Sequence, residues 1–310
     1  MGSPVLWAVF NACVIGALAL DLGIHRRAHR VSLSEAAVWS VVWVLLSLAF
    51  DLWIFRTHGR TPALEFLTGY LVEKSLSLDN IFVFLLVFRS FGIEQQFQHR
   101  VLHWGLVGAL ILRGGMIAIG TALLQRFTWV LYLLGAVLFV SGVRMLWRGQ
   151  HDFHPEQNPV LRWLRRVLPI SPTHAHETFF VQEGGQTMVT PLFLTLLTIE
   201  FSDLIFAVDS IPAVFGITRD PFIVYTSNVC AILGLRAFYF LLAGAFQYFR
   251  FLDAGLSAIL IFIGGKMLAE PWFHLSTPAA LGVISMILAI AIGASIFAAK
   301  ESNRNDGPIH

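Results

Sequence analysis

The amino-acid sequence predicts an all-α fold, a polytopic membrane bundle of about nine transmembrane helices. Its composition is the first indication: 56% of the 310 residues are hydrophobic and only 13% are charged, whereas soluble domains carry about 25% charged residues. The second is that the apolar residues form stretches of about 20, the length that a helix needs to cross a bilayer with its backbone hydrogen bonded internally. The lipid bilayer is therefore the solvent that the sequence predicts.

Nine segments reach that length, and they are expected at residues 5–24, 35–55, 64–88, 101–124, 128–147, 189–217, 222–247, 252–269 and 278–299. A single transmembrane domain, 1–310, follows from them. It consists of two N-terminal spans (5–55), a first group of three (64–147), a polar cytoplasmic connector (148–188), a second group of three (189–269) and a last span (278–299).

Lys and Arg predict the orientation, because basic residues favour the cytoplasmic side of a membrane. With the N-terminus outside and the C-terminus in the cytoplasm, most of the loop cations lie inside, and the outer loops hold Arg56, Arg60, Arg126 and Arg219. The formal net charge of +2 is too small to indicate a nucleic-acid partner.

An internal repeat relates the two groups of three spans. Glu73-Lys-Ser-Leu-Ser-Leu-Asp79-Asn-Ile81 aligns with Asp203-Leu-Ile-Phe-Ala-Val-Asp209-Ser-Ile211, and Leu112-Arg113 aligns with Leu235-Arg236. Because three spans are an odd number, the two copies enter the membrane from opposite sides. Many secondary transporters have such an inverted repeat, with the binding site near the midplane. Duplicated bundles also occur in proteins that do not transport, so the repeat alone leaves both classes open.

The third and sixth spans concentrate carboxylates, which are costly inside a membrane unless they are paired, protonated or open to water. The predicted metal ligands are Glu73, Asp79, Asn80, Glu200, Asp203, Asp209 and Ser210, and the predicted counter-charges are Lys74, Arg113 and Arg236. The five acids and three cations leave an excess of two negative charges, which one divalent ion would neutralise. The alternative is a set of buried salt bridges in which Arg113 and Arg236 only fix the packing of the helices.

Oxygen ligands of this kind suit Mg, Ca or Mn, whereas zinc or copper would favour His or Cys. Glu73 and Asp79 lie about 9 Å apart along a helix, too far to share one ion. In an inverted pair of helices the early acid of one lies level with the late acid of the other. The sequence therefore predicts two stations, Glu73 with Asp209 and Asp203 with Asp79. Pro212, which lacks an amide donor, would be able to unwind the sixth span beyond them.

Long motifs around these residues resemble a known family. They are Ala63-Leu-Glu-Phe-Leu-Thr-Gly-Tyr-Leu-Val-Glu-Lys-Ser-Leu-Ser-Leu-Asp-Asn80, Phe206-Ala-Val-Asp-Ser-Ile-Pro212, Asp220-Pro-Phe-Ile-Val-Tyr-Thr-Ser-Asn228 and Leu233-Gly-Leu-Arg-Ala-Phe-Tyr-Phe-Leu-Leu-Ala-Gly244. The chain resembles the TerC family and, within it, the Alx-like manganese exporters, over about residues 15–300. The resemblance implies a multi-pass protein of the bacterial inner membrane that exports Mn(II).

The sequence thus predicts a secondary transporter that exports a divalent cation, with manganese and the outward direction implied by the resemblance alone. It predicts no enzyme and no permanently bound cofactor. Nucleotide-driven pumping and zincin chemistry lack support, since the sequence has no GxGxxG, P-loop or HExxH motif. Proton antiport suits carboxylates, which bind protons as well as metal ions. Two alternatives remain: export of another small substrate, such as an amino acid or a tellurium oxyanion, and a scaffold for membrane-protein assembly or metal loading that recruits partners through residues 148–188.

Overall fold

The computed structural model describes residues 2–24, 32–127, 129–148, 169–171, 178–183, 185–243, 251–273 and 275–305 of the chain. Its elements are α1 (Pro4–Ile24), α2 (Leu33–His58), α3 (Arg60–Ser90), α4 (Gln95–Arg126), α5 (Trp129–Arg148), β1 (Phe180–Glu183), β2 (Gln186–Val189), α7 (Pro191–Phe215), α8 (Pro221–Leu233), α9 (Leu235–Ala243), α10 (Leu252–Ala269) and α11 (Thr277–Asn305).

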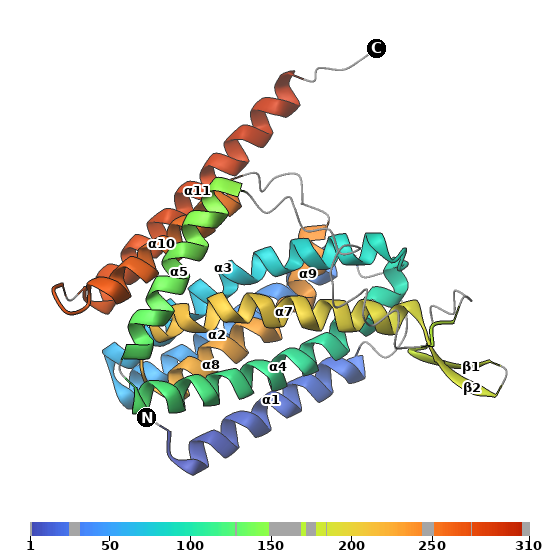
Figure 1. Ribbon diagram of the computed structural model, residues 1–310, viewed down its shortest axis with the longest axis horizontal. Coiled ribbons are helices and arrows are strands. Elements are labelled where there is room, and N and C mark those ends of the chain that lie inside the picture. Colours follow the sequence, from blue (N-terminus) through green and yellow to red (C-terminus); the bar gives the residue numbers. More distant parts are fainter. Residues whose placement is uncertain are drawn as a thin grey trace.

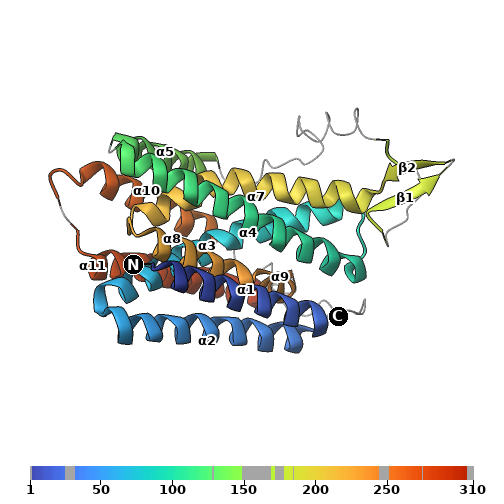
Figure 2. The ribbon, with the colours of Figure 1, turned by 90° about the horizontal axis from the view of Figure 1, so that it is seen from below.

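The helices form one elongated bundle (Figure 1). Helices α3 and α7 lie in its middle, packed on each other and on α8 and α4. Figure 2 shows α1 and α2 on one side of this layer and α5 on the opposite side, where α5 packs against α10. The two acid-bearing segments that the sequence singled out therefore lie next to each other in the interior.

A short β-hairpin corrects the prediction of an all-α chain, although the chain is mostly helical. Strands β1 and β2 pair antiparallel, with Phe180 opposite Val189, and the hairpin projects from one end of the bundle (Figures 1 and 2). The turn contains Gly185 at a φ of 80°, a conformation that favours glycine. The hairpin lies in the predicted connector, of which residues 149–168, 172–177 and 184 are outside the described residues.

Helices occupy the places of all the predicted spans, but only some of them meet the requirements for crossing a membrane. Within the described residues, α2, α4, α5, α7 and α11 are long and apolar enough, and α8 with α9 makes a sixth if the bent pair is one span. The apolar parts of α1 and α10 are shorter, and α3 is long but carries the charged residues. The structure is thus a membrane protein with five or six candidate spans, and nine crossings remain a prediction.

Two predicted helices differ in detail from expectation. The seventh span is broken at Gly234, where α8 and α9 meet at 42°, and a Cβ on Gly234 would lie 3.0 Å from Trp43 Cβ of α2. Close approach of α2 therefore requires a residue without a side chain at this break. The sixth span does not unwind at Pro212: α7 continues to Phe215, and the amide of Gly216 still donates to Pro212 O at 2.9 Å.

Helix α3 is held firmly in the interior by close packing along its length. Phe66 packs among side chains of α1, α2 and α8 near its start, and Phe88 packs edge-on against Tyr239 of α9 near its end. Gly69 permits the closest approach, because a Cβ there would lie 2.9 Å from Ser227 Oγ of α8. This contact sets the depth of α3 relative to α8, and with it the depth of the acidic motif.

Candidate functional site

Two hydrogen bonds define an antiparallel register between α3 and α7. Asn80 Nδ2 donates to Asp203 Oδ1 at 2.8 Å, and Thr218 Oγ1, just beyond the end of α7, donates to Glu65 Oε2 at 2.6 Å. Glu65 and Asn80 of α3 are fifteen residues apart, and so are Asp203 and Thr218. One continuous register therefore aligns the acidic motifs of the two helices.

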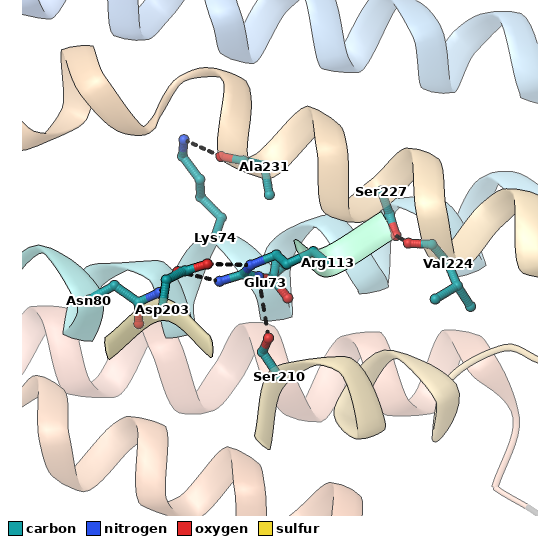
Figure 3. A network of polar contacts seen from close by, with 9 residues as sticks. All are labelled: Glu73, Lys74, Asn80, Arg113, Asp203, Ser210, Val224, Ser227 and Ala231. Carbon is teal, nitrogen blue, oxygen red and sulfur yellow. Dashed lines mark hydrogen bonds and ion pairs between the residues drawn. The ribbon is translucent and has the colours of Figure 1, made fainter. Parts of the chain in front are cut away.

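Arg113 of α4 joins these helices midway along that register (Figure 3). Its Nε and Nη2 donate to both carboxylate oxygens of Asp203, at 3.0 and 2.9 Å, a bidentate pair of the strong kind. Its Nη1 forms an ion pair with Glu73 Oε1 and donates to Ser210 Oγ at 3.3 Å. One guanidinium thus holds the first acid of each motif.

These side chains form a central cluster, which we define as Glu73, Asn80, Arg113, Asp203 and Ser210. The cluster is closed to solvent, with exposed fractions of 0% for Glu73, 2% for Arg113 and 3% for Asp203. Charges that have lost their hydration persist only where good geometry and further hydrogen bonds compensate. The cluster contains two carboxylates and one guanidinium, a donor set with more acids than bases that would favour a further cation.

Glu200 lies one helical turn from Asp203 and lines a small cavity. The cavity has a volume of about 20 Å³, with Asp203 and Arg236 also in its wall, which is room for roughly one water molecule or one dehydrated ion. Gly108 of α4 makes space for the carboxylate, because a Cβ there would collide with Glu200 Oε1. Glu200 Oε2 is buried without a hydrogen-bond partner among the described side chains.

Asp209, the later acid of the α7 motif, contacts α5. Asp209 Oδ1 accepts a hydrogen bond from Ser141 Oγ of α5 at 3.0 Å. The backbone of Asp79 is part of α3 beside Asn80, but its side chain is not among the described residues. The two cross-pairs expected from the sequence therefore stay predictions.

Lys74, a predicted counter-charge for the acids, contacts α8 and α9 instead. Its Nζ donates to Ala231 O at 3.2 Å and lies 4.9 Å from the centre of the Phe238 ring. Ala231 is in the last turn of α8, where carbonyl groups lack helical partners and carry partial negative charge. Lys74 therefore caps the carboxyl end of α8 at the break before α9.

A larger polar cavity of about 210 Å³ opens where α3 begins and where α7 and α10 end. We call it the mouth cavity, and its polar lining includes Glu65, Thr218, Arg219, Lys266 and Glu270. Arg219 Nη2 pairs with Glu270 Oε1 at 2.8 Å in partly exposed positions. The mouth cavity lies at the end of the same α3–α7 register that contains the central cluster.

No group of three or more His, Cys, Asp and Glu side chains in the described part of the chain converges closely enough to hold a metal ion. The guanidinium of Arg113 lies between Glu73 and Asp203, where a shared cation would bind. The surrounding donors are carboxylate, amide and hydroxyl oxygens, which suit hard divalent cations.

Sequence reasoning missed three residues that contact the acids or line the mouth cavity: Glu65, Ser141 and Thr218. Glu65 carried a usable signal, since it is an acid inside the predicted span 64–88. Thr218 and Ser141 carried none, because uncharged hydroxyl side chains are common in membrane helices and only the packing reveals that they face a carboxylate.

Comparison with known proteins gives a consistent result. Residues 58–303 match the family model described as "Integral membrane protein TerC family". The chain is 46% identical over 307 residues to "Uncharacterized membrane protein STKORF319" of Myxococcus xanthus, covering 99% of this chain and 96% of the relative. It is 47% identical over 298 residues to "Putative membrane-bound redox modulator Alx" of Escherichia coli (strain K12), covering 93% of each. No solved structure matches the chain.

Proposed function

Because the chain belongs to the TerC family of integral membrane proteins, we propose that it is a secondary transporter that exports a divalent metal cation, Mn(II), through the site between α3 and α7. One observation carries the proposal: Glu73 and Asp203, buried carboxylates from two helices, meet on Arg113 in the middle of an apolar bundle. Ionisable groups so deep among membrane helices are costly and characteristic of ion and proton pathways.

The donor types support a hard cation. The proposed ligands on α3 and α7 are Glu73, Asp79, Asn80, Glu200, Asp203, Asp209 and Ser210. All offer oxygen, and neither helix contributes His or Cys, so zinc and copper are disfavoured relative to Mn, Mg or Ca. Mn(II) in particular is implied by the family resemblance.

Arg113 competes with the cation for the same carboxylates. A divalent ion placed between Glu73 and Asp203 would repel the guanidinium, so binding there requires Arg113 to move. Glu73 Oε2 is buried and has no partner among the described side chains, which makes it the first carboxylate oxygen of the central cluster open to an ion. We therefore assign Arg113 the role of a counter-ion that keeps the acids charged and in place between transport events.

The packing of the helices supports an inverted repeat of α3–α5 and α7–α10. Helix α3 packs on α8 as α7 packs on α4, and α5 packs on α10. If α3, α4 and α5 are exchanged with α7, α8–α9 and α10, the α3–α8 contact becomes the α7–α4 contact. The α5–α10 contact becomes itself. The exchange is imperfect, since α4 is continuous where α8 and α9 are separated at Gly234. In this proposal, α1, α3 and α10 also cross the membrane, which gives nine spans.

The proposed location is the bacterial inner membrane, with the N-terminus outside and residues 148–188 in the cytoplasm. This orientation puts the mouth cavity on the outer side, at the exit of the pathway. Single cysteines placed near Gly185 and near Arg219 test it. A membrane-impermeant thiol reagent should label only the second of them in intact spheroplasts.

Transport itself is tested by reconstituting the full-length protein into liposomes. Mn(II), Ca(II), Mg(II) and Zn(II) are compared with and without a pH gradient. We expect Mn(II) flux that the gradient accelerates, because carboxylates that release metal can take up protons. Glu73→Gln and Asp203→Asn should each abolish most of this flux. Absence of flux for all four ions from the wild-type protein would refute the proposal.

Redox modulation is a second candidate function, taken from the printed description of the relatives. One observation favours it: Cys13 and Cys230, the two cysteines of the chain, both line an apolar cavity of about 370 Å³ among α1, α2 and α8. A double Cys13→Ser, Cys230→Ser variant separates the candidates. An exporter should keep its Mn(II) flux, whereas a thiol-based redox function should be lost.

A further inference from the structure

Asn228 of α8 is a buried amide with no hydrogen-bond partner among the described residues. Its exposed fraction is 1%, and neither Oδ1 nor Nδ2 is hydrogen bonded to any described residue. An unpaired buried amide is costly, and nearly all such groups in proteins have partners. The two residues before it differ: Thr226 Oγ1 donates to Phe222 O at 2.7 Å and Ser227 Oγ to Val224 O at 3.2 Å. Asn228 is thus distinct from the other polar side chains of its own helical turn.

Helical periodicity gives the direction in which Asn228 points. Residues four apart lie on the same face of a helix, so Asn228 shares its face with Val224. Val224 lies in one hydrophobic cluster with Ile211 and Val214 of α7 and Ile117 of α4. One turn further along, Asn228 therefore faces the space between α7 and α4, which is the space that contains the central cluster.

The packing of α8 on α3 shows at which level of α3 Asn228 lies. Gly69 lies level with Ser227, and the two helices run in the same direction. Asn228 is therefore level with the turn of α3 that precedes Glu73. Glu73 lies four residues beyond Gly69, on the face of α3 that contacts α8. Because both side chains lean towards the amino ends of their helices, Glu73 and Asn228 stay about one helical turn apart in level, within reach of one ion between them. In Figure 3, Arg113 is drawn between the segment of α8 that carries Ser227, above it, and Ser210 of α7, below it.

We propose that Asn228 is a ligand of the transported ion, with its Oδ1 and Glu73 Oε2 forming an oxygen pair on the α8 side of Arg113. Both oxygens are buried and have no partner among the described side chains. Amide oxygens are common ligands of hard divalent cations. A neutral ligand also holds the ion less tightly than a third carboxylate would, which suits a site that must release its cargo. The inference rests on the proposed function and deepens it, because it places one wall of the site on α8.

Asn228→Leu is the decisive variant, with Thr226→Val as its matched control. Leu has a similar volume but no polar atom, and Thr226 is equally buried but hydrogen bonded within its own helix. Mn(II) binding is measured by the metal-dependent shift in the melting temperature of the full-length protein in detergent, and transport in liposomes. We expect Asn228→Leu to weaken Mn(II) binding and to lower flux at least tenfold, with an unchanged or higher melting temperature without metal. Asn228→Asp should bind Mn(II) at least as tightly as the wild type and release it more slowly.

Binding and flux together separate this inference from the proposed function. If the wild type binds Mn(II) but does not move it, export fails, and the binding data alone judge Asn228. If Asn228→Leu binds Mn(II) with wild-type affinity, or if Thr226→Val loses binding equally, the assignment of Asn228 is wrong. A wild type that binds none of Mn(II), Ca(II) and Mg(II) refutes both.

Discussion

Two arginine–carboxylate pairs of nearly equal length lie at different levels of the α3–α7 register, one in its middle and one at its end. Arg113 and Asp203 approach to 2.9 Å in the central cluster, and Arg219 and Glu270 to 2.8 Å at the mouth cavity. Their side-chain exposures are 2% and 4% in the first pair and 57% and 39% in the second. Water can replace a lost partner at the mouth but not in the centre. The same contact therefore has very different consequences at the two levels.

The mouth cavity is also much larger than the cavity beside the central cluster. The mouth cavity, at about 210 Å³, holds several water molecules, whereas the cavity at Glu200, at about 20 Å³, holds roughly one. In the proposed transporter an ion exchanges most of its hydration shell for protein oxygens between these levels. Selectivity then belongs to the central cluster, and the mouth controls mainly how fast ions enter or leave.

Removing Arg113 is the strongest test of this contrast. Arg113→Met leaves Glu73 and Asp203 buried as uncompensated charges, so we expect destabilisation of about 3–5 kcal/mol. The measurement is the melting temperature and the yield of monodisperse protein in detergent. Neutralising both acids in the same background, with Glu73→Gln and Asp203→Asn, should restore most of the stability but no transport. Wild-type stability of Arg113→Met alone would show that the cluster is not charged as described.

Gly108 tests whether the Glu200 carboxylate must remain in its small cavity. In Gly108→Ala the new methyl group takes the place of Glu200 Oε1, and the flexible carboxylate moves away at little cost to the fold. We expect Mn(II) flux to fall at least tenfold, with a melting temperature close to that of the wild type. Gly115→Ala on the same helix is the control, because a Cβ there has no neighbour within 4 Å. Equal flux in both variants would exclude Glu200 from the pathway.

The residues of the central cluster, unlike their contacts, could be predicted because charged residues inside apolar spans are rare and must find partners. Glu73, Arg113 and Asp203 stand out on that ground alone, and the helices that carry the two acids do pack together. The positions of the helices were predictable for the same reason, since uninterrupted apolar stretches of about 20 residues leave few alternatives.

The directions of individual side chains could not be predicted. Asp209 faces Ser141 and Lys74 faces Ala231 because of how each helix is rotated about its axis. A helix that is apolar on most faces gives no periodic signal for that rotation. The close approach of Trp43 of α2 to Gly234 at the break is equally invisible in the sequence. The β-hairpin was missed because it is short and lies in a polar connector.

Glu65 tests the mouth level of the comparison. Glu65→Gln keeps an oxygen that can accept from Thr218 but removes a negative charge from the lining of the mouth cavity. We expect Mn(II) flux to fall only a few-fold, because Lys266 and Arg219 in the same lining already offset part of the field. The effect should shrink between 0.01 and about 0.5 M salt as the charges are screened. If Glu65→Gln lost as much Mn(II) flux as Glu73→Gln, and did so at every salt concentration, Glu65 would be a direct ligand of the ion.

The exposed pair gives the smallest expected effect and completes the contrast. Arg219→Ala removes a partner that solvent replaces, so the cost in stability should be below about 1 kcal/mol, and flux should stay within twofold of the wild type. High salt should bring the variant and the wild type together, since screening weakens the intact pair as well. Melting temperatures measured at low and high salt provide the check. A salt-independent loss similar to that of Arg113→Met would mean that the mouth cavity closes around Arg219 during transport, and the two levels would then no longer differ in kind.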